Sequence, residues 1–209
     1  MRSKEGQALA DVPESAMVST SGQPGWVTGE LPPEYGQLAE KIQALKAEAH
    51  KFEKIAAVLW QTGSPLVTAV SELFAALQFR VETSESGAAS YDLAVHLEKD
   101  RRLLVEVVGG HEAIDRRSPH ITQILKALQD DAGEHDRVVL VANAHSETPP
   151  ADRRQEPVTA DALRLIQGLG ANFINTPTLF GIWRYSLQDL PGARNSVLRL
   201  HSQDGGVFR

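Results

Sequence analysis

Two acidic residues on neighbouring predicted strands are the clearest candidates for chemistry. Residues 91–97 and 103–108 are β-rich runs joined by a charged turn, which predicts a β-hairpin. Asp92 begins the first run and Glu106 lies near the end of the second. Hard cations such as Mg²⁺ prefer carboxylate oxygens, and they can activate water for phosphodiester hydrolysis. The pair therefore predicts a weak Mg²⁺ site; the alternative is a structural or solvated pair of acids.

Other kinds of active site find little support in the sequence. The chain contains no cysteine, which excludes thiolate nucleophiles, thiolate metal ligands and disulfides. Its histidines lack the close helical spacing of zinc ligands, and there is no glycine-rich phosphate loop or serine nucleophile motif. The histidines considered as ligands are His111, His120, His135, His145 and His201.

Three arginine pairs lie in predicted loops or turns. Arginine suits bidentate contacts with phosphate, so these pairs are candidates for a rim that contacts nucleic acid. The alternative is that they are solvated loop residues. The candidate nucleic-acid-binding residues are the six arginines and a glutamine on the helix after the hairpin: Arg101, Arg102, Arg116, Arg117, Arg153, Arg154 and Gln123.

The composition is that of an ordinary globular protein, with 42% hydrophobic and 23% charged residues. The net charge of −6 opposes non-specific coating of nucleic acid, because such binding depends on cationic side chains that displace counterions. It still allows a local basic surface. No apolar run approaches the ~20 residues of a membrane span, and the N-terminus lacks a signal peptide. We expect no membrane partner and a cytoplasmic location.

The chain divides into four expected parts. Residues 1–33 are rich in Gly, Ser, Pro and Glu, which predicts a disordered tail. Residues 34–62 predict an amphipathic helix that either packs on its own domain or forms a coiled coil with a protein partner or a second copy. Residues 63–190 predict the main domain, and 191–209 a C-terminal extension. The heptad stripe of the helix consists of Leu38, Ile42, Leu45, Ala49, Phe52, Ala56 and Leu59.

Within the main domain, the order of elements predicts an α/β fold. A helical apolar pattern precedes a short strand near residues 79–81 and the hairpin, and Ser118-Pro119 predicts the start of a further helix. Residues 137–142 (RVVLVA) form a continuous apolar run, typical of a strand buried on both faces. We expect this strand in the same sheet as the hairpin, after the helix that crosses between them. The fold class is a mixed central sheet flanked by helices.

The hairpin resembles the signature of a known nuclease superfamily. Asp92, Glu106 and the following Val107-Val108-Gly109 resemble the D-x(n)-E-x-K-G pattern of the PD-(D/E)xK, or restriction-endonuclease-like, superfamily. The resemblance covers most of residues 56–185. It includes the first helix and strand (WQTGSPLVTAVSELFAALQFRVE), the central hairpin strand (RRLLVEVVGG), the strand after the crossover (RVVLVANAHSETPPADRR), and a final strand and helix similar to a bacterial branch (ANFINTPTLFGIW). It implies that Asp92 and Glu106 hold Mg²⁺ in a DNA endonuclease.

The sequence departs from that pattern at two positions. Val108 lies where the family has its catalytic lysine, which by this resemblance positions water and stabilises charge on the phosphate; valine can do neither. Val67 lies where active relatives often carry an acid. Lys126, on the helix after the hairpin, is the candidate replacement for the lysine, and Gln123 is a candidate polar support on the same helix.

Three functions follow from these expectations. The first is a pseudo-nuclease, which retains the fold, has impaired or lost cleavage, and binds DNA or protein. The second is an active Mg²⁺-dependent DNA endonuclease in which Lys126 supplies the relocated cation beside Asp92 and Glu106. The third is an assembly subunit that acts through the helix at 34–62.

Overall fold

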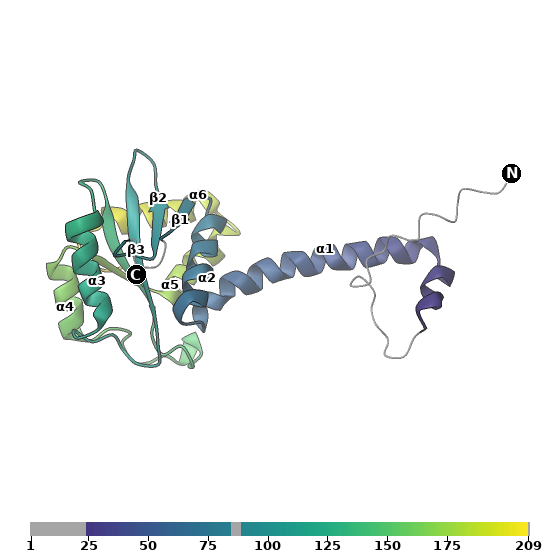
Figure 1. Cartoon of the computed structure of the whole chain (residues 1–209), viewed down its shortest axis with the longest axis horizontal. Helices are drawn as coiled ribbons and strands as arrows, with labels where there is room; N and C mark the ends of the chain where they lie inside the picture. The colour runs from purple at the N-terminus through teal and green to yellow at the C-terminus, as the bar shows by residue number, and fades with distance from the viewer. Residues whose placement is uncertain (1–23, 85–88, 209) are drawn as a thin grey trace. The chain divides into compact units, whose positions relative to one another are not determined.

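The computed structural model describes residues 24–84 and 89–208, in two compact units, Met1–Glu53 and Lys54–Arg209. The second unit is an α/β domain with six strands, shown with its labels in Figure 1. Its main helices are α2 (Gly63–Ala76), α3 (Pro119–Lys126), α4 (Ala160–Gly168), α5 (Thr176–Ser186) and α6 (Leu190–Ser202). Its strands are β1 (Arg80–Thr83), β2 (Leu93–His96), β3 (Arg102–Gly109), β4 (Arg137–Asn143), β5 (Asn172–Asn175) and β6 (Gly206–Val207). Three short turns of helix are η4 (Ala57–Leu59), the π-helical η5 (Ala127–Asp131) and η6 (Pro150–Asp152).

The sheet is mixed, with strands in the order β1-β2-β3-β4-β5-β6. Strands β1, β2 and β3 are antiparallel, whereas β3, β4, β5 and β6 run parallel. The predicted hairpin and the neighbouring position of residues 137–142 are therefore confirmed. The hairpin turn closes at Lys99 and Asp100, whose φ angles are 62° and 56°. Positive φ at both central residues gives a turn whose twist matches that of the strands.

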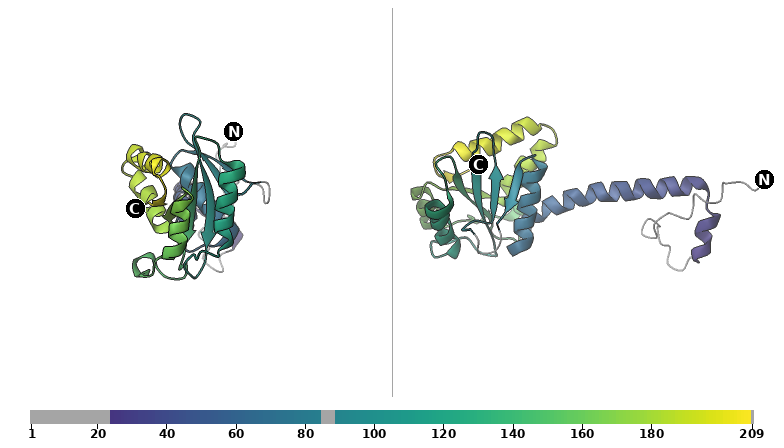
Figure 2. Two further views of the ribbon diagram at one scale, coloured as in Figure 1. Left: turned by 90° about the vertical axis from the view of Figure 1, so that its left-hand side faces the viewer. Right: turned by 45° about the horizontal axis from the view of Figure 1, so that its top comes forward.

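Helices cover both faces of the sheet. Helices α3 and α4 pack on one face, and α2, α5 and α6 pack on the other, as the edge-on view in Figure 2 shows. Alternation along β3 divides its apolar side chains between the two layers: Leu104 contacts the α3 side, and Val105 contacts the α2 side. Both side chains are fully buried, and each such burial contributes about 1.5–3 kcal/mol to folding.

The C-terminal residues belong to the domain and do not form a separate extension. Helix α6 contributes Ala193, Val197 and Leu200 to the core, and β6 pairs with β5 as the sixth strand. Asp189 caps α6 by accepting a hydrogen bond from the Gly192 amide at 2.9 Å. The predicted domain boundary at residue 190 therefore cuts through helix α6, whose side chains form part of the core.

The first unit contains η3 (Gly25–Glu30) and most of helix α1 (Pro33–Ala56). The expected tail at 1–33 falls largely outside the described residues. The helix expected over residues 34–62 ends earlier than predicted, because η4 follows Ala56. Leu38 and Leu45 of the predicted stripe are 56% and 64% exposed. No helix of the described part of the chain is long and apolar enough to span a membrane.

A close approach at Gly109, at the end of β3, gives a test of this packing. A Cβ atom there would lie 2.9 Å from Leu66 Cδ2 and 3.0 Å from the backbone Cα of Thr62. At Gly110 a Cβ atom would meet nothing within 4 Å. We expect Gly109→Ala to lower the free energy of unfolding by about 1–3 kcal/mol through overpacking, and Gly110→Ala to change it little, as measured by urea denaturation. Equal stability of the two variants would contradict this packing.

Candidate functional site

The alternation of side chains on β3 directs Glu106 toward helix α3. Leu104 and Val108, two residues to either side, both pack in the apolar layer beneath α3 and α4. Glu106 occupies the same face and is only 6% exposed. A carboxyl group at this depth requires a polar partner, because an unpaired buried charge is strongly destabilising.

That partner is His120, in the first turn of α3. Its Nδ1 lies 2.7 Å from Glu106 Oε1. Ser118 is the N-cap and Pro119 the first residue of α3, an arrangement that ends the loop immediately before His120. Ile124, four residues later, is fully buried, and residues at this spacing lie on the same helical face. The face that packs Ile124 on the sheet therefore brings His120 to Glu106.

Asp92 joins this pair from the residue before β2. Its Oδ2 accepts a hydrogen bond from the Val107 amide at 2.7 Å, and its own amide donates to Val105 O at 2.9 Å. Because Val107 directly follows Glu106 on β3, this hydrogen bond brings the Asp92 carboxyl group next to Glu106. The site therefore consists of two carboxyl groups and one imidazole, which we call the carboxyl–histidine cluster (Asp92, Glu106 and His120).

Burial raises the pKa of both carboxyl groups in the cluster. For Glu106 the hydrogen bond from His120 opposes this shift, whereas the neighbouring Asp92 charge adds to it. For Asp92 the Val107 amide and the nearby His120 oppose it. Loss of solvent is the largest cause in each case, so the cluster favours protonated carboxyl groups more than water does.

A cavity of about 480 Å³ opens beside the cluster. Its walls come from the end of β3, the loop that follows it and the start of α3, and they include Val108 and His120. Asp92 and Glu106 do not line this cavity. The cavity therefore meets the cluster through an apolar valine and an imidazole that is already bonded to Glu106.

These contacts do not fit a Mg²⁺ site. Mg²⁺ needs ionised carboxylate oxygens in near-octahedral geometry. Here one oxygen of each carboxyl group is engaged, by Val107 and by His120, and burial opposes ionisation. Among residues 24–84 and 89–208, no group of three or more His, Asp or Glu side chains is arranged to hold a metal ion. We therefore derive no step through a bound metal.

Lys126 and Gln123 lie on α3 with His120. Lys126 is in the last turn of α3, is exposed, and does not line the cavity beside the cluster. Within residues 24–84 and 89–208, Lys126 makes no hydrogen bond or ion pair with Asp92 or Glu106, whereas His120 is bonded to Glu106. Gln123 is half-buried, one helical turn after His120. The basic side chain in contact with Glu106 is thus a histidine.

The six predicted arginines separate into two groups. Arg101 and Arg102 lie at the start of β3, at the opposite end from Glu106, and Arg102 is bonded to Asp136 by Nε at 3.1 Å and by Nη2 at 2.5 Å. The other four arginines are Arg116, Arg117, Arg153 and Arg154. They follow β3 and β4, whose carboxyl ends meet at the same edge of the sheet. Open α/β sheets commonly bind ligands at this edge.

A buried polar network fixes the carboxyl end of β4. Asn143 is fully buried and donates to Gln61 O at 2.9 Å. Its Oδ1 accepts from Thr176 Oγ1 and from Arg153 Nη1, each at 2.9 Å. Arg153 also donates to the carbonyl oxygens of Thr148 and Leu59, and burial lowers its pKa. Arg153 thus has a structural role, which its place in the sequence does not reveal.

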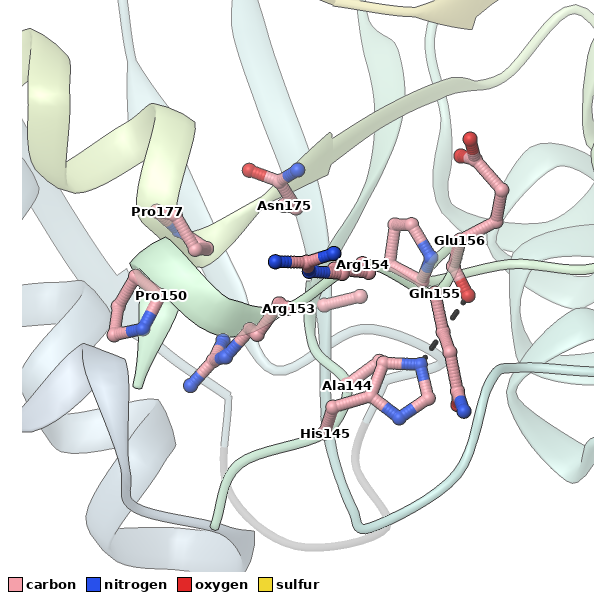
Figure 3. Close-up of a pocket in the computed structure, with 11 residues that line it drawn as sticks. Ala144, His145, Pro150, Arg153, Arg154, Gln155, Glu156, Asn175 and Pro177 are labelled. Carbon is pink, nitrogen blue, oxygen red and sulfur yellow. Dashed lines mark hydrogen bonds between the residues drawn. The ribbon is translucent and has the colours of Figure 1, made fainter. Parts of the chain in front are cut away.

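A second cavity, of about 250 Å³, lies against this network at the ends of β4 and β5. Figure 3 shows the Arg154 guanidinium beside the Asn175 side chain, while Arg153 turns toward Pro150. His145 separates the two cavities. Its Nδ1 lies 3.1 Å from His111 O, in the loop after β3, and its Nε2 lies 3.3 Å from Glu156 O. Ala144 lines both cavities.

The sequence interpretation missed His120, Asn143 and Asn175 as polar residues of these sites. For His120 a signal existed: it lies four residues before Ile124 of the apolar α3 stripe, directly after a Ser-Pro helix start. Asn143 and Asn175 each end an apolar strand, and strand ends at this edge are where polar site residues gather.

Comparison of the chain with protein-family models, with curated proteins and with solved structures finds no match.

The raised pKa of Glu106 has a consequence for stability. The folded state binds the Glu106 proton more tightly than the unfolded chain does, so the protonated side chain contributes to the free energy of unfolding. This contribution is complete below pH 4.5, the ordinary pKa of glutamate, and is lost as the pH rises through the raised pKa of the folded state. Glu106→Gln removes that contribution. We expect the stability of Glu106→Gln relative to wild type to increase between about pH 4 and pH 7, measured by urea denaturation. Glu112→Gln, on the exposed loop, is the control and should show no such trend. Parallel pH curves for wild type and Glu106→Gln would contradict the burial argument.

Proposed function

We propose that residues 63–208 form a restriction-endonuclease-like domain that binds nucleic acid and cleaves it poorly or not at all. The order α2-β1-β2-β3-α3-β4 supports the first part of this proposal. It is the sequence of first helix, first strand, hairpin, crossover helix and buried strand that the resemblance implies. The antiparallel β2–β3 pair and the parallel β3–β4 pair place Asp92 and Glu106 beneath the crossover helix α3.

The observation that carries the loss of cleavage is the bonding of the two carboxyl groups. Glu106 is bonded to His120 and Asp92 to the Val107 amide, and Val108 offers the cavity an apolar wall where the family has a lysine. A missing cation at the reacting phosphate costs about 3–4 kcal/mol, by analogy with single oxyanion-stabilising donors. This loss corresponds to roughly a hundred- to thousand-fold in rate.

Exposed arginines near the carboxyl edge support nucleic-acid binding. Arg116 and Arg117 are exposed in the loop between β3 and α3, next to Asp115 and Ser118, which line the larger cavity. With a net charge of −6, binding by this chain depends on a local basic surface. A protein–DNA contact that neutralises one phosphate adds about 0.9 to the slope of log K against log salt.

The test measures cleavage and binding in the same samples. We expect wild type, Lys126→Ala and Glu106→Ala to leave supercoiled plasmid intact in Mg²⁺, while a labelled duplex still binds, as shown by fluorescence anisotropy. The Arg116→Gln/Arg117→Gln variant should reduce the salt slope by about 2. Arg164→Gln/Arg184→Gln, on exposed faces of α4 and α5, is the matched control.

The same experiment distinguishes the alternatives. Plasmid cleavage by wild type that is lost in both Glu106→Ala and Lys126→Ala would favour the active endonuclease with a relocated lysine. Cleavage that appears only in Val108→Lys would support the assigned site and its missing cation. Absence of nucleic-acid binding by the wild type would contradict the proposed function.

We propose self-association as a second role, located on α1. The exposed side chains of Leu38 and Leu45 lie seven residues apart on the heptad stripe. In a parallel coiled coil, Lys41 would oppose Lys46 of the second copy, and Glu48 would oppose Glu53. In an antiparallel pair, Lys41 lies opposite Glu48 instead. The charges on the helix therefore favour an antiparallel pair of copies of this chain.

Light scattering on the full chain tests this second role. We expect a dimeric mass for wild type and a monomeric mass for Leu38→Gln/Leu45→Gln, because the apolar contact is removed from both copies. Glu40→Gln/Ala47→Gln, on the opposite face of α1, is the control and should remain dimeric. A monomeric wild type at the highest soluble concentration would exclude the role.

A further inference from the structure

The smaller cavity contains a cation that has no partner in the described part of the chain. Arg154 makes no hydrogen bond or ion pair with any residue in 24–84 or 89–208, although it lines a hollow of about 250 Å³ together with Asn175 and His145. The acidic residue Glu156 also lines this cavity, but Figure 3 shows that its carboxylate points away from Arg154.

The Asn175 side chain adds a donor to the same space. Its Oδ1 accepts a hydrogen bond from the Thr178 amide at 2.8 Å, as the N-cap of α5. This hydrogen bond shows which atom of the Asn175 amide is the oxygen, so the other atom, Nδ2, remains available as a donor. Figure 3 shows the Asn175 side chain beside the Arg154 guanidinium. A planar guanidinium and an amide NH₂ group together form a set of donors without an acceptor.

The rest of the cavity wall holds these two groups in place. Arg153, the preceding residue, has three hydrogen-bond acceptors, one of them on buried Asn143, so the backbone that carries Arg154 is fixed. Three further lining residues are prolines, Pro150, Pro157 and Pro177, whose ring constrains φ. The backbone that carries the two donors is thus held in place, while the Arg154 side chain itself is exposed to an incoming ligand. A backbone that is already held lowers the entropy lost when a ligand binds.

We propose that this cavity binds a phosphomonoester, with Arg154 and Asn175 as its direct ligands and Arg153 as a positioning residue. A terminal phosphate carries close to two negative charges at neutral pH and three acceptor oxygens, which match a bidentate arginine and one amide donor. A hollow of about 250 Å³ admits a phosphate group that enters end-on. A phosphodiester inside a strand continues on both sides and needs a longer groove.

The phosphomonoester comes either from a free nucleotide or from the 5′ end of a nucleic-acid strand. The strand source rests on the proposed function, and it is favoured by the position of the cavity. The cavity shares Ala144 with the larger cavity at the carboxyl–histidine cluster, and His145 bonds to the loops on both sides. A strand whose 5′ phosphate occupies the Arg154 cavity would begin at the same sheet edge as Arg116 and Arg117.

Binding assays on the full chain test the proposal with four probes. They are inorganic phosphate and a 5′-mononucleotide, measured by calorimetry, and one labelled oligonucleotide with or without a 5′ phosphate, measured by anisotropy. We expect the 5′ phosphate to strengthen oligonucleotide binding at least about tenfold in wild type, the scale of charge-assisted hydrogen bonds. Arg154→Gln should abolish that difference, while Arg164→Gln, on the exposed face of α4, should keep it.

The outcomes separate this proposal from the proposed function. Oligonucleotide binding that depends neither on the 5′ phosphate nor on Arg154 overturns the phosphomonoester site and leaves nucleic-acid binding intact. Binding of inorganic phosphate or the mononucleotide alone, lost in Arg154→Gln, supports the site and assigns it to a free nucleotide. No Arg154-dependent binding of any probe, with an unchanged unfolding transition in the variant, overturns the site.

Discussion

A carboxyl group on an interior face of the sheet is the constraint on which the candidate site depends. Glu106 lies between Leu104 and Val108 on β3, beneath α3, and is nearly excluded from solvent. A buried polar group left without a hydrogen-bond partner costs about 1–3 kcal/mol. His120 provides that partner, so the position of α3 and the chemistry of the site are linked. The buried Glu106, bonded to His120, is better suited to stabilise the contact between α3 and the sheet than to bind a metal ion.

A second buried polar group has a corresponding role at the neighbouring strand. Asn143 ends β4, and it binds the segment before α2, the start of α5 and Arg153. The first two segments are distant in sequence and Arg153 lies in the loop after β4, so the network joins three connections at the carboxyl edge of the sheet. Buried polar networks with every donor and acceptor paired are rigid. The network thus holds the backbone next to Arg154, whose exposed guanidinium lines the smaller cavity and has no partner in residues 24–84 and 89–208.

Much of the sheet could be predicted from the sequence, because its strands carry strong local signals. The apolar run Val138–Ala142 and the turn at Lys99-Asp100 specify a buried strand and a hairpin without reference to the rest of the chain. Helix α6 and strand β6 were missed even though Asp189-Leu190-Pro191 is a helix-start signal. The short strand Gly206–Val207 has too little pattern to be recognised, since its pairing depends on β5.

The site was only half predictable for a related reason. Asp92 and Glu106 were identified because they lie on strands whose pairing follows from the hairpin. The contacts of His120 and Arg153 depend on where α3 and the loop after β4 pack, and local sequence does not specify these positions. The exposure of Leu38 and Leu45 was also not predictable, because a heptad pattern does not reveal whether its partner belongs to the same chain.

The hydrogen bonds of Asp92 with the Val107 amide and of Glu106 with His120 leave both carboxyl groups poorly suited to bind a metal ion. Titration with Mn²⁺, followed by electron paramagnetic resonance, measures this directly in wild type and in Asp92→Asn/Glu106→Gln. We predict that the two proteins bind Mn²⁺ equally weakly up to free concentrations on the order of millimolar, because wild-type Asp92 and Glu106 are engaged by the Val107 amide and His120. A wild-type site that is saturated below that concentration and is absent from the double variant would contradict the claim.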